Sequence, residues 1–196
     1  MRSVTLFILI LFFLACGQST SSENEKKNTT PEFSVQDTID EETLIAKLST
    51  ALSSDTGRVG QERNTIVNFL IDQGKDMDHT NSGLFYKVYQ EGNGELLQWA
   101  DYIKVDYKGY FLDGKVFDSS YERGEPISFY IGNMVDGWNE GLQLLSPGAK
   151  ASFIVPSHLG YGEKGFPLSP GKFLVPPNTI IAFDVEVLEK LPDPNK

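Results

Sequence analysis

The stretch MVDGWNEGLQLLSPG, residues 134–148, places a tryptophan, Trp138, at the first turn of a short predicted helix. Gly137 precedes the tryptophan and Gly141 follows it one turn later. Because glycine has no side chain, this spacing is interpreted as leaving one face of the indole uncovered. A tryptophan that serves only the core normally lies in the middle of an element, with side chains packed on both of its faces. Why this helix should leave its largest side chain uncovered is a question that the rest of the chain has to answer.

On both sides of this helix the hydrophobic pattern has a period of two, which is typical of strands with one buried face. Five segments alternate in this way between Gly, Pro, Asn or Asp residues: GLFYKVYQEG (83–92), YIKVDYKGYF (102–111), EPISFYIG (125–132), AKASFIVP (149–156) and TIIAFDVEVLEKL (179–191). The sequence LDGK at 112–115 is typical of a hairpin turn. Four to six strands around one helix at 138–145 predict an α+β domain, in which a strongly curved antiparallel sheet wraps the helix.

Two short helices are predicted upstream of the strands, in a helical extension at residues 37–80. Asp40 is a helix-capping residue before EETLIAKLSTAL, and Gln61 opens QERNTIVNFLIDQG, in which Ile66, Phe69 and Leu70 share a face and Gly74 is a natural stop. Neither helix is long enough to be stable alone, so we expect at least one of them to pack on the strands.

The first residues have the pattern of a signal peptide, predicted at residues 1–15. Arg2 is followed by an apolar run at 4–14, which is about half of the roughly 20 residues that a membrane-spanning helix needs. The run ends in FLAC, and Cys16 is the only cysteine. FLAC resembles a bacterial lipobox, although Phe13 stands where such motifs usually have Leu. The resemblance implies cleavage before Cys16 and acylation of that residue. The alternatives are an ordinary signal peptide with an incidental cysteine, or an uncleaved anchor.

Residues 16–36 are predicted to be a polar tether, since 17–31 shows no apolar period.

The composition excludes several classes of function. The chain has 17 basic and 27 acidic residues, so loss of Arg2 with the leader leaves 16 against 27, a net charge of −11. No basic cluster is present that could bind a nucleic acid. His79 and His158 lack the paired spacing of a zinc site, and no nucleophile elbow or phosphate loop occurs. We therefore expect no metal and no cofactor.

Aromatic residues recur near the predicted loops. Tyr107, Phe117, Trp138, Tyr161 and Phe183 lie in five different segments. For any one of them, ordinary core packing is the simpler interpretation. The whole set, with an acid beside Phe117, is more typical of a concave apolar pocket that has few polar groups.

Three blocks of this region, VDYKGYFLDGKVFDSSYERGEPISFYIG, VDGWNEGLQLLSPGAKASFIVPSHLGYG and VPPNTIIAFDVEVLEKL, resemble successive blocks of the FKBP-type peptidyl-prolyl cis/trans isomerases. The resemblance extends over residues 83–191, and the corresponding domain is placed at 81–192. It implies a half-barrel of five or six antiparallel strands around one short helix. The helical extension and the lipobox resemble those of membrane-tethered FKBP lipoproteins of Gram-negative bacteria, including members associated with gliding motility.

The resemblance also implies a role for individual residues. Trp138 would form the floor of a pocket for the substrate proline, and Tyr161 would donate a hydrogen bond to the substrate carbonyl. Asp118 would border the rotating bond, with Arg123 as its charge partner. These residues and Phe117 form the implied catalytic set. The implied substrate contacts are Tyr107, Val135, Phe183, Met134 through its backbone, Ile127 where an aromatic is common, and Leu174 and Val175 in a flap at 163–177 that is longer than the minimal version.

The function implied by the resemblance is peptidyl-prolyl isomerisation at X–Pro bonds of envelope or secreted proteins. The implied partners are proline-containing segments, the membrane through lipid on Cys16, and macrolide inhibitors. The implied location is the cell envelope, on the outer membrane, and a monomer is expected. Two alternatives remain open: a non-catalytic chaperone that binds proline-containing segments, and a structural lipoprotein of an envelope complex.

Overall fold

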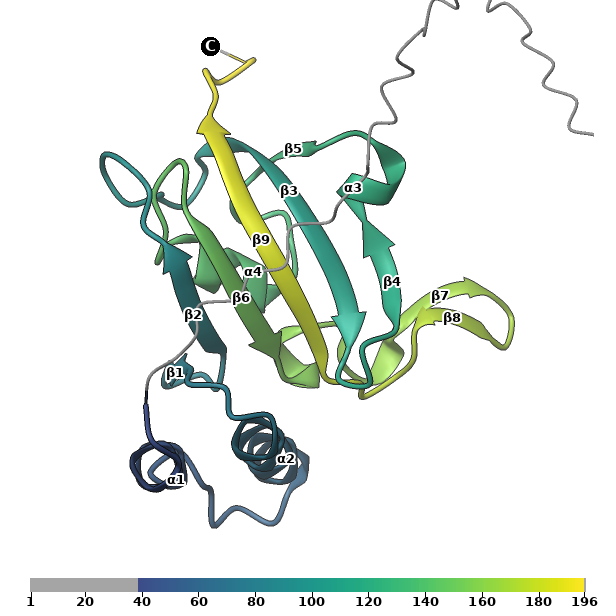
Figure 1. Ribbon diagram of the computed structural model, residues 1–196. Helices are drawn as coiled ribbons and strands as arrows, with labels where there is room; N and C mark the ends of the chain where they lie inside the picture. The colour runs from purple at the N-terminus through teal and green to yellow at the C-terminus, as the bar shows by residue number, and fades with distance from the viewer. Residues whose placement is uncertain (1–38, 196) are drawn as a thin grey trace, which may run out of the picture.

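The computed structural model describes residues 39–195, and the predicted leader, Cys16 and the whole predicted tether lie outside these residues. Figure 1 shows one strongly curved sheet with α4 inside its curve and α1 and α2 beyond one end. All strand pairings are antiparallel, in the order β1-β2-β6-β9-β3-β4, and β5 also pairs with β3. The strands of this sheet are β1 (Asp78–His79), β2 (Phe85–Gln90), β3 (Tyr102–Phe111), β4 (Val116–Ser119), β5 (Ile127–Tyr130), β6 (Lys150–Val155) and β9 (Ile181–Lys190).

This arrangement confirms the predicted fold class. Each of the five predicted strand segments contains one strand of the sheet. The sheet has seven strands because β1 and β4 join it, one more than the largest predicted number. The LDGK turn is also confirmed: Gly114 has a φ of +85°, and the Phe111 N–H donates to the Lys115 carbonyl at 3.0 Å.

The sheet separates two hydrophobic cores, because successive side chains of a strand point to opposite faces. Phe153 and Phe183 belong to the core inside the curve, and their neighbours Ile154 and Ala182 belong to the core outside it. The inner core also contains Trp138, which is only 1% exposed. The candidate site lies on this inner side.

Helix α4 (Asp136–Leu142) lies inside the curve, and it corrects the interpretation of the two glycines around Trp138. A Cβ atom on Gly137 would lie 2.6 Å from Val155 Cγ1, and one on Gly141 would lie 2.8 Å from the Phe153 ring. The glycines therefore let the helix approach β6 closely, and they do not expose the indole. The prediction that they uncover one face of Trp138 was wrong.

Helices α1 (Glu41–Ser49) and α2 (Arg58–Asp72) cover the outer core. The cap at Asp40 is confirmed, since its side chain accepts a hydrogen bond from the Thr43 N–H at 2.9 Å. Helix α2 begins at Arg58, earlier than the predicted Gln61, and Gly74 follows it with a φ of +61°. Buried residues of both helices share one cluster with the sheet: Leu44, Leu48, Ala51, Ile66, Val67, Leu70, Met77, Phe85, Ile154 and Ala182. As expected, the helices pack on the strands.

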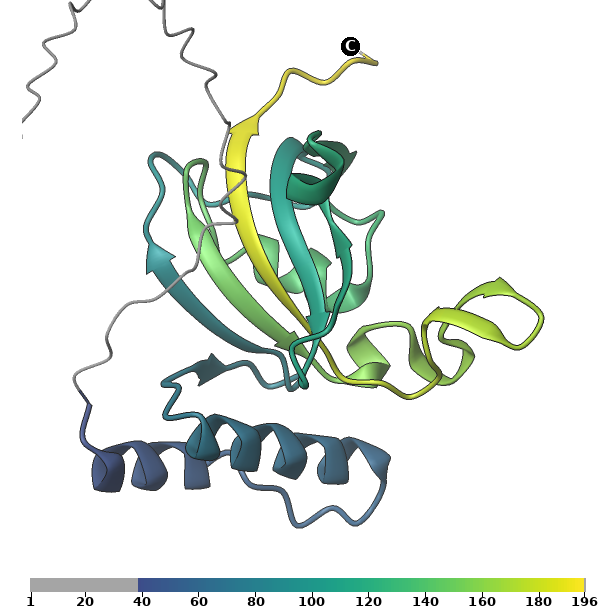
Figure 2. The same cartoon turned by 45° about the vertical axis from the view of Figure 1, so that its right-hand side comes forward.

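Five further short elements were not predicted. They are α3 (Ser120–Arg123), the 3-10 helices η1 (Ser157–Leu159) and η2 (Gly162–Lys164), and a hairpin of β7 (Phe166–Ser169) and β8 (Lys172–Val175). Figure 2 shows the hairpin projecting away from the main sheet. No helix among residues 39–195 has the length and apolar character needed to cross a membrane.

Candidate functional site

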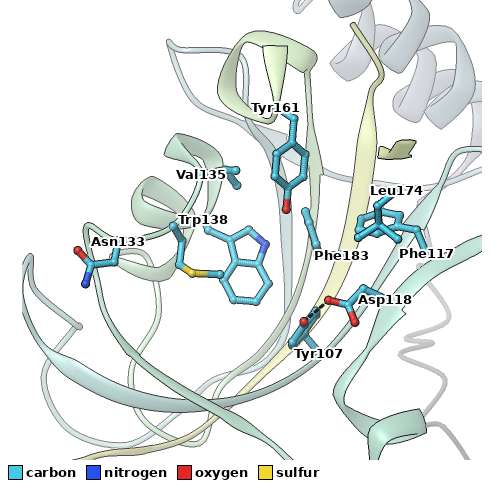
Figure 3. Close-up of a pocket in the computed structure, with 10 residues that line it drawn as sticks. Tyr107, Phe117, Asp118, Asn133, Val135, Trp138, Tyr161, Leu174 and Phe183 are labelled. Carbon is cyan, nitrogen blue, oxygen red and sulfur yellow. Dashed lines mark hydrogen bonds between the residues drawn. The ribbon is translucent and has the colours of Figure 1, made fainter. Parts of the chain in front are cut away.

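A cavity of about 170 Å³ opens on the inner side of the sheet. Helix α4, strands β3, β4 and β9, the loop before α4, the segment at Tyr161 and the hairpin strand β8 all contribute to it. Figure 3 shows the side chains converging from these elements on one space. The lining residues are Tyr107, Phe117, Asp118, Asn133, Met134, Val135, Trp138, Tyr161, Leu174 and Phe183.

The floor of the cavity is aromatic. The Trp138 ring centroid lies 5.2 Å from that of Tyr107 and 5.2 Å from that of Phe183, both in edge-to-face geometry. Phe117 meets Phe183 in the same way at 5.7 Å. Aromatic pairs favour this edge-to-face arrangement, which fixes each ring by its neighbours. The floor is therefore a rigid apolar surface.

A glycine in β3 makes room for this cluster. Gly109 pairs with Phe183 of β9 and with Asp118 of β4. A Cβ atom on Gly109 would lie 2.7 Å from the Phe117 ring and 2.9 Å from the Phe183 ring. The two walls can therefore meet only because this position has no side chain.

One edge of the cavity is polar. The Tyr107 hydroxyl donates to Asp118 Oδ2, and Arg123 pairs with Asp118 Oδ1. Arg123 Nη2 also donates to the Tyr107 hydroxyl at 3.1 Å, and its guanidinium lies 5.4 Å from the Tyr107 ring centroid. Both oxygens of Asp118 are thus engaged, and the predicted pairing of Asp118 with Arg123 is present. Burial, followed by the hydrogen bond to Asp118, raises the pKa of Tyr107 to about 12.

Helix α3 explains how Arg123 reaches this edge. The Ser119 side chain caps the helix by accepting from the Glu122 N–H at 3.3 Å, and Gly124 ends it with a φ of +72°. The buried Ser120 hydroxyl accepts from the Tyr107 N–H at 2.8 Å and donates to Asp106 at 2.6 Å. The helix is therefore fixed to β3, and its last residue, Arg123, points back at the tyrosine.

Tyr161 closes the opposite side of the cavity. Figure 3 shows its hydroxyl directed into the cavity. Burial, followed by the negative charge of Asp118, raises the pKa of Tyr161. The Tyr161 hydroxyl makes no hydrogen bond within residues 39–195, and in the same part of the chain the buried Trp138 Nε1 has no partner either. The Tyr161 hydroxyl opens on the cavity, so it is free to donate to an acceptor oxygen of a molecule bound there.

The loop before α4 is held by a residue that the sequence did not single out. Asn139 is 5% exposed, and its side-chain oxygen accepts from the Gly132 N–H at 2.8 Å and from the Met134 N–H at 3.2 Å. Its amide nitrogen donates to the Met134 carbonyl at 2.7 Å. Asn139 therefore fixes the loop that brings Asn133, Met134 and Val135 to the cavity.

The structure brings nine of the eleven predicted site residues of this domain together at the cavity and adds Asn133. Ile127 and Val175 do not line it. Ile127 pairs with Val105 at the edge of the sheet, and Val175, 1% exposed, is turned into the inner core. The Gly132–Asn133 dipeptide next to the helix start was the available signal for Asn133.

The described residues offer no other obvious chemistry at this site. Among residues 39–195 no three His, Cys, Asp or Glu side chains are grouped as a metal ion would require. The hairpin adds an apolar element instead: Leu174 reaches the cavity, and the Phe166 ring lies 5.4 Å from the Tyr161 ring. The site can therefore bind an apolar group and donate a hydrogen bond to a carbonyl oxygen next to that group.

Comparison with known proteins agrees with this geometry. A family model described as FKBP-type peptidyl-prolyl cis-trans isomerase matches residues 94–188. A probable FKBP-type peptidyl-prolyl cis-trans isomerase of Haemophilus influenzae is 40% identical over 158 residues, which is 79% of this chain and 64% of that protein. The FKBP-type isomerase FkpA of Escherichia coli is 42% identical over 120 residues, 61% of this chain and 42% of FkpA. The chain thus spans less than two thirds of the length of either relative.

Solved structures show the same fold. The crystal structure of AtFKBP13 aligns with a TM-score of 0.57 and 32% identity, covering 59% of this chain and 99% of that one. The crystal structure of FkpA from Escherichia coli aligns with a TM-score of 0.60 and 35% identity, covering 76% of this chain and 65% of that one. With a family model, curated relatives and a whole solved domain in agreement, the chain belongs to the FKBP-type peptidyl-prolyl cis-trans isomerase family.

Proposed function

We propose that the protein is a peptidyl-prolyl cis/trans isomerase and that the cavity on α4 receives the proline ring. The observation that supports this most is the combination of an aromatic floor with the unpartnered Tyr161 hydroxyl. The cavity, about 170 Å³, is smaller than the roughly 300–1,000 Å³ of pockets for drug-sized ligands. It suits one small ring better than a large cofactor.

The chemistry requires little of the protein. Rotation about an X–Pro bond has a barrier of roughly 18–20 kcal/mol, which arises from amide resonance. The twisted amide has lost that resonance and is less polar than the planar one, so an apolar site binds it better. Such preferential binding of the transition state lowers the barrier, and each 1.4 kcal/mol or so gives a tenfold increase in rate.

The residues of the site divide this task. Trp138 and Phe183 hold the proline ring in place. The residue before the proline then rotates about the X–Pro bond relative to that fixed ring. Tyr161 donates its free hydroxyl to the carbonyl oxygen of the substrate. Asp118, already paired with Arg123 and Tyr107, borders the rotating bond and provides a fixed negative field beside it. No covalent step is needed.

The test is a prolyl-isomerisation assay on a short X–Pro peptide, with the purified chain and its Asp118→Leu variant. We expect acceleration by the wild-type chain, a smaller acceleration by the variant, and inhibition by a macrolide that competes for the cavity. A chain that binds the peptide without accelerating isomerisation would be the non-catalytic chaperone. A chain with no affinity for proline peptides would favour a structural role in an envelope complex.

We further propose that the protein is a lipoprotein of the cell envelope, anchored on the outer membrane by acyl groups on Cys16, and that its clients are envelope or secreted proteins. The support is the apolar run at 4–14, too short to span, followed by the lone cysteine. Several acyl chains anchor firmly, at about 0.8 kcal/mol per buried methylene, whereas one chain binds only marginally. Uncatalysed X–Pro isomerisation takes tens to hundreds of seconds, which is slow enough to limit client folding.

Labelling with a fatty acid tests the anchor. The wild-type chain should take up the label and fractionate with membranes, and Cys16→Ser should do neither. Unlabelled wild-type protein in the soluble fraction would contradict the anchor and leave a secreted or periplasmic isomerase. A pull-down with chains truncated in the tether and helices would test the alternative of a structural complex.

A further inference from the structure

We propose that Glu62, in the N-terminal helix α2, is a positioning residue for Tyr161 and makes the helical extension part of the catalytic machinery. The inference rests on the proposed isomerase function. Glu62 is 8% exposed although it carries a carboxylate, and it belongs to neither the cavity nor its polar edge. Both of its oxygens bind a single residue, Ser157, which begins η1.

The geometry of this contact is specific. Glu62 Oε2 accepts from the Ser157 N–H at 2.7 Å, and Oε1 accepts from the Ser157 hydroxyl at 2.6 Å. These lengths are typical of charge-assisted hydrogen bonds. The Ser157 N–H is at the start of a helix, where no backbone carbonyl can accept from it. Burying a carboxylate costs folding free energy, and an apolar residue could pack α2 against the rest of the domain without that cost. What the carboxylate adds is a fixed position for Ser157.

Ser157 begins the segment that carries the cavity tyrosine. Its carbonyl accepts from the Gly160 N–H at 3.0 Å, and Tyr161 follows directly. The carbonyl of Gly162 then accepts from the Asn178 N–H at 2.8 Å, so the same segment is tied to the base of the flap. A displacement of Ser157 is therefore transmitted to the place from which the Tyr161 hydroxyl enters the cavity.

A second contact holds the middle of the segment. His158 Nε2 lies 3.0 Å from the Ser82 carbonyl oxygen, and the Ser82 hydroxyl donates to Glu140 of α4 at 2.6 Å. The side of η1 facing α4 is thus already fixed relative to Trp138. Glu62 is the charged contact that fixes the side facing α2. Its loss should let the segment rotate about the His158 contact without unfolding the sheet.

The test compares Glu62→Ala, Glu62→Gln and Tyr161→Phe, singly and with Glu62→Ala combined with Tyr161→Phe, in the full chain in detergent. Glu62→Ala should lower kcat/KM about two- to tenfold, the range that one neutral hydrogen bond supplies. Glu62→Gln should restore most of it, because the amide oxygen can accept from the Ser157 N–H and the amide nitrogen can donate to the Ser157 hydroxyl. In the Tyr161→Phe background Glu62→Ala should have almost no further effect.

Leu70→Ala is the matched control. Leu70 is fully buried on the same helix and packs on the outer core, away from η1. It should lower stability and leave kcat/KM unchanged while the chain is folded. If Leu70→Ala and Glu62→Ala reduce kcat/KM equally, or if Glu62→Ala acts equally with and without the Tyr161 hydroxyl, the positioning role is wrong. Ser157→Ala removes only the hydrogen bond from the Ser157 hydroxyl to Glu62 and keeps the one from the N–H. Its kcat/KM should lie between that of wild type and that of Glu62→Ala, and it tests the contact even if Glu62→Ala folds poorly.

Hydrogen exchange separates this inference from the proposed function. Amides of Leu159 and Gly160, which donate within η1, should exchange faster in Glu62→Ala and not in Leu70→Ala. A wild-type chain without isomerase activity would contradict the proposed function and, with it, the catalytic role of Glu62. Unchanged exchange at these amides in Glu62→Ala would overturn the inference whatever the activity.

Discussion

Replacing Trp138 by alanine should damage catalysis and stability by amounts that the structure allows us to estimate separately. The indole is 1% exposed and contacts the rings of Tyr107, Phe129 and Phe183. Truncation of a buried Trp to Ala costs about 3–5 kcal/mol of unfolding free energy. A domain with a typical stability of about 5–15 kcal/mol remains folded after that loss.

The loss of activity follows from the contact with the substrate. A proline ring brings three methylene groups, each worth about 0.8 kcal/mol when buried, and the floor covers one of the two ring faces. Removing the floor should then cost about 1.2 kcal/mol of transition-state binding, which is close to a tenfold fall in kcat/KM. The measurement is kcat/KM on a short X–Pro peptide, with circular dichroism and a denaturant titration on the same sample.

Leu142→Ala supplies the control for this prediction. Leu142 is fully buried on the same helix but does not line the cavity. Its truncation should cost about 2–5 kcal/mol of stability and leave kcat/KM unchanged. A folded Trp138→Ala variant with full activity, or an equal loss of activity in both variants, would refute the assignment of Trp138 as the floor.

Three further predictions concern the rest of the site. Tyr161→Phe should lower kcat/KM modestly, since one neutral hydrogen bond is worth about 0.5–1.5 kcal/mol. Asp118→Leu should lower kcat/KM more, because the electrostatic field beside the substrate amide is lost. Unchanged turnover of both variants on several peptides would contradict the roles given to Tyr161 and Asp118. Burial raises the pKa of Tyr107 to about 12, above the ordinary value near 10. The protonated Tyr107 side chain therefore adds about 2–3 kcal/mol to the unfolding free energy, and this contribution is complete below pH 10 and is lost as the pH rises to about 12. Denaturant titrations across that interval should show a smaller loss for Tyr107→Phe than for wild type, and equal losses would contradict this. Gly141→Ala should cost about 1–3 kcal/mol of unfolding free energy through overpacking against Phe153, as measured by thermal unfolding. Unchanged stability of this variant would contradict the close packing of α4 on β6.

Much of the fold was predictable because the chain alternates between apolar and polar residues wherever a strand has one buried face. The cap at Asp40 and the stop at Gly74 were also predictable, since both depend on residues that are close in sequence. The extra strands β1 and β4 were missed, because β1 has only two residues and the four residues of β4, VFDS, do not alternate between apolar and polar. The start of α2 was misplaced because Gly57 caps it without a side-chain hydrogen bond.

The sequence predicted most of the residues that line the cavity, but not the contacts that hold them there. Gly137 and Gly141 are small because β6 lies against them, and this contact joins residues that no local pattern connects. Asn139 and Glu62 escaped notice for the same reason. Each looks like an ordinary polar residue on a helix, and its role comes from partners that the fold brings to it: Gly132 and Met134 for Asn139, and Ser157 for Glu62.

Exchange spectroscopy by NMR tests the central claim most directly, because it observes isomerisation and binding in one sample. A short X–Pro peptide gives separate cis and trans resonances, and their uncatalysed exchange, at tens to hundreds of seconds, is too slow to connect them. With a substoichiometric amount of the chain, the two sets should become linked by exchange cross-peaks, and the indole N–H resonance of Trp138 should shift as peptide is added. A shift of the Trp138 resonance without exchange cross-peaks would contradict the isomerase account and leave a proline-binding module.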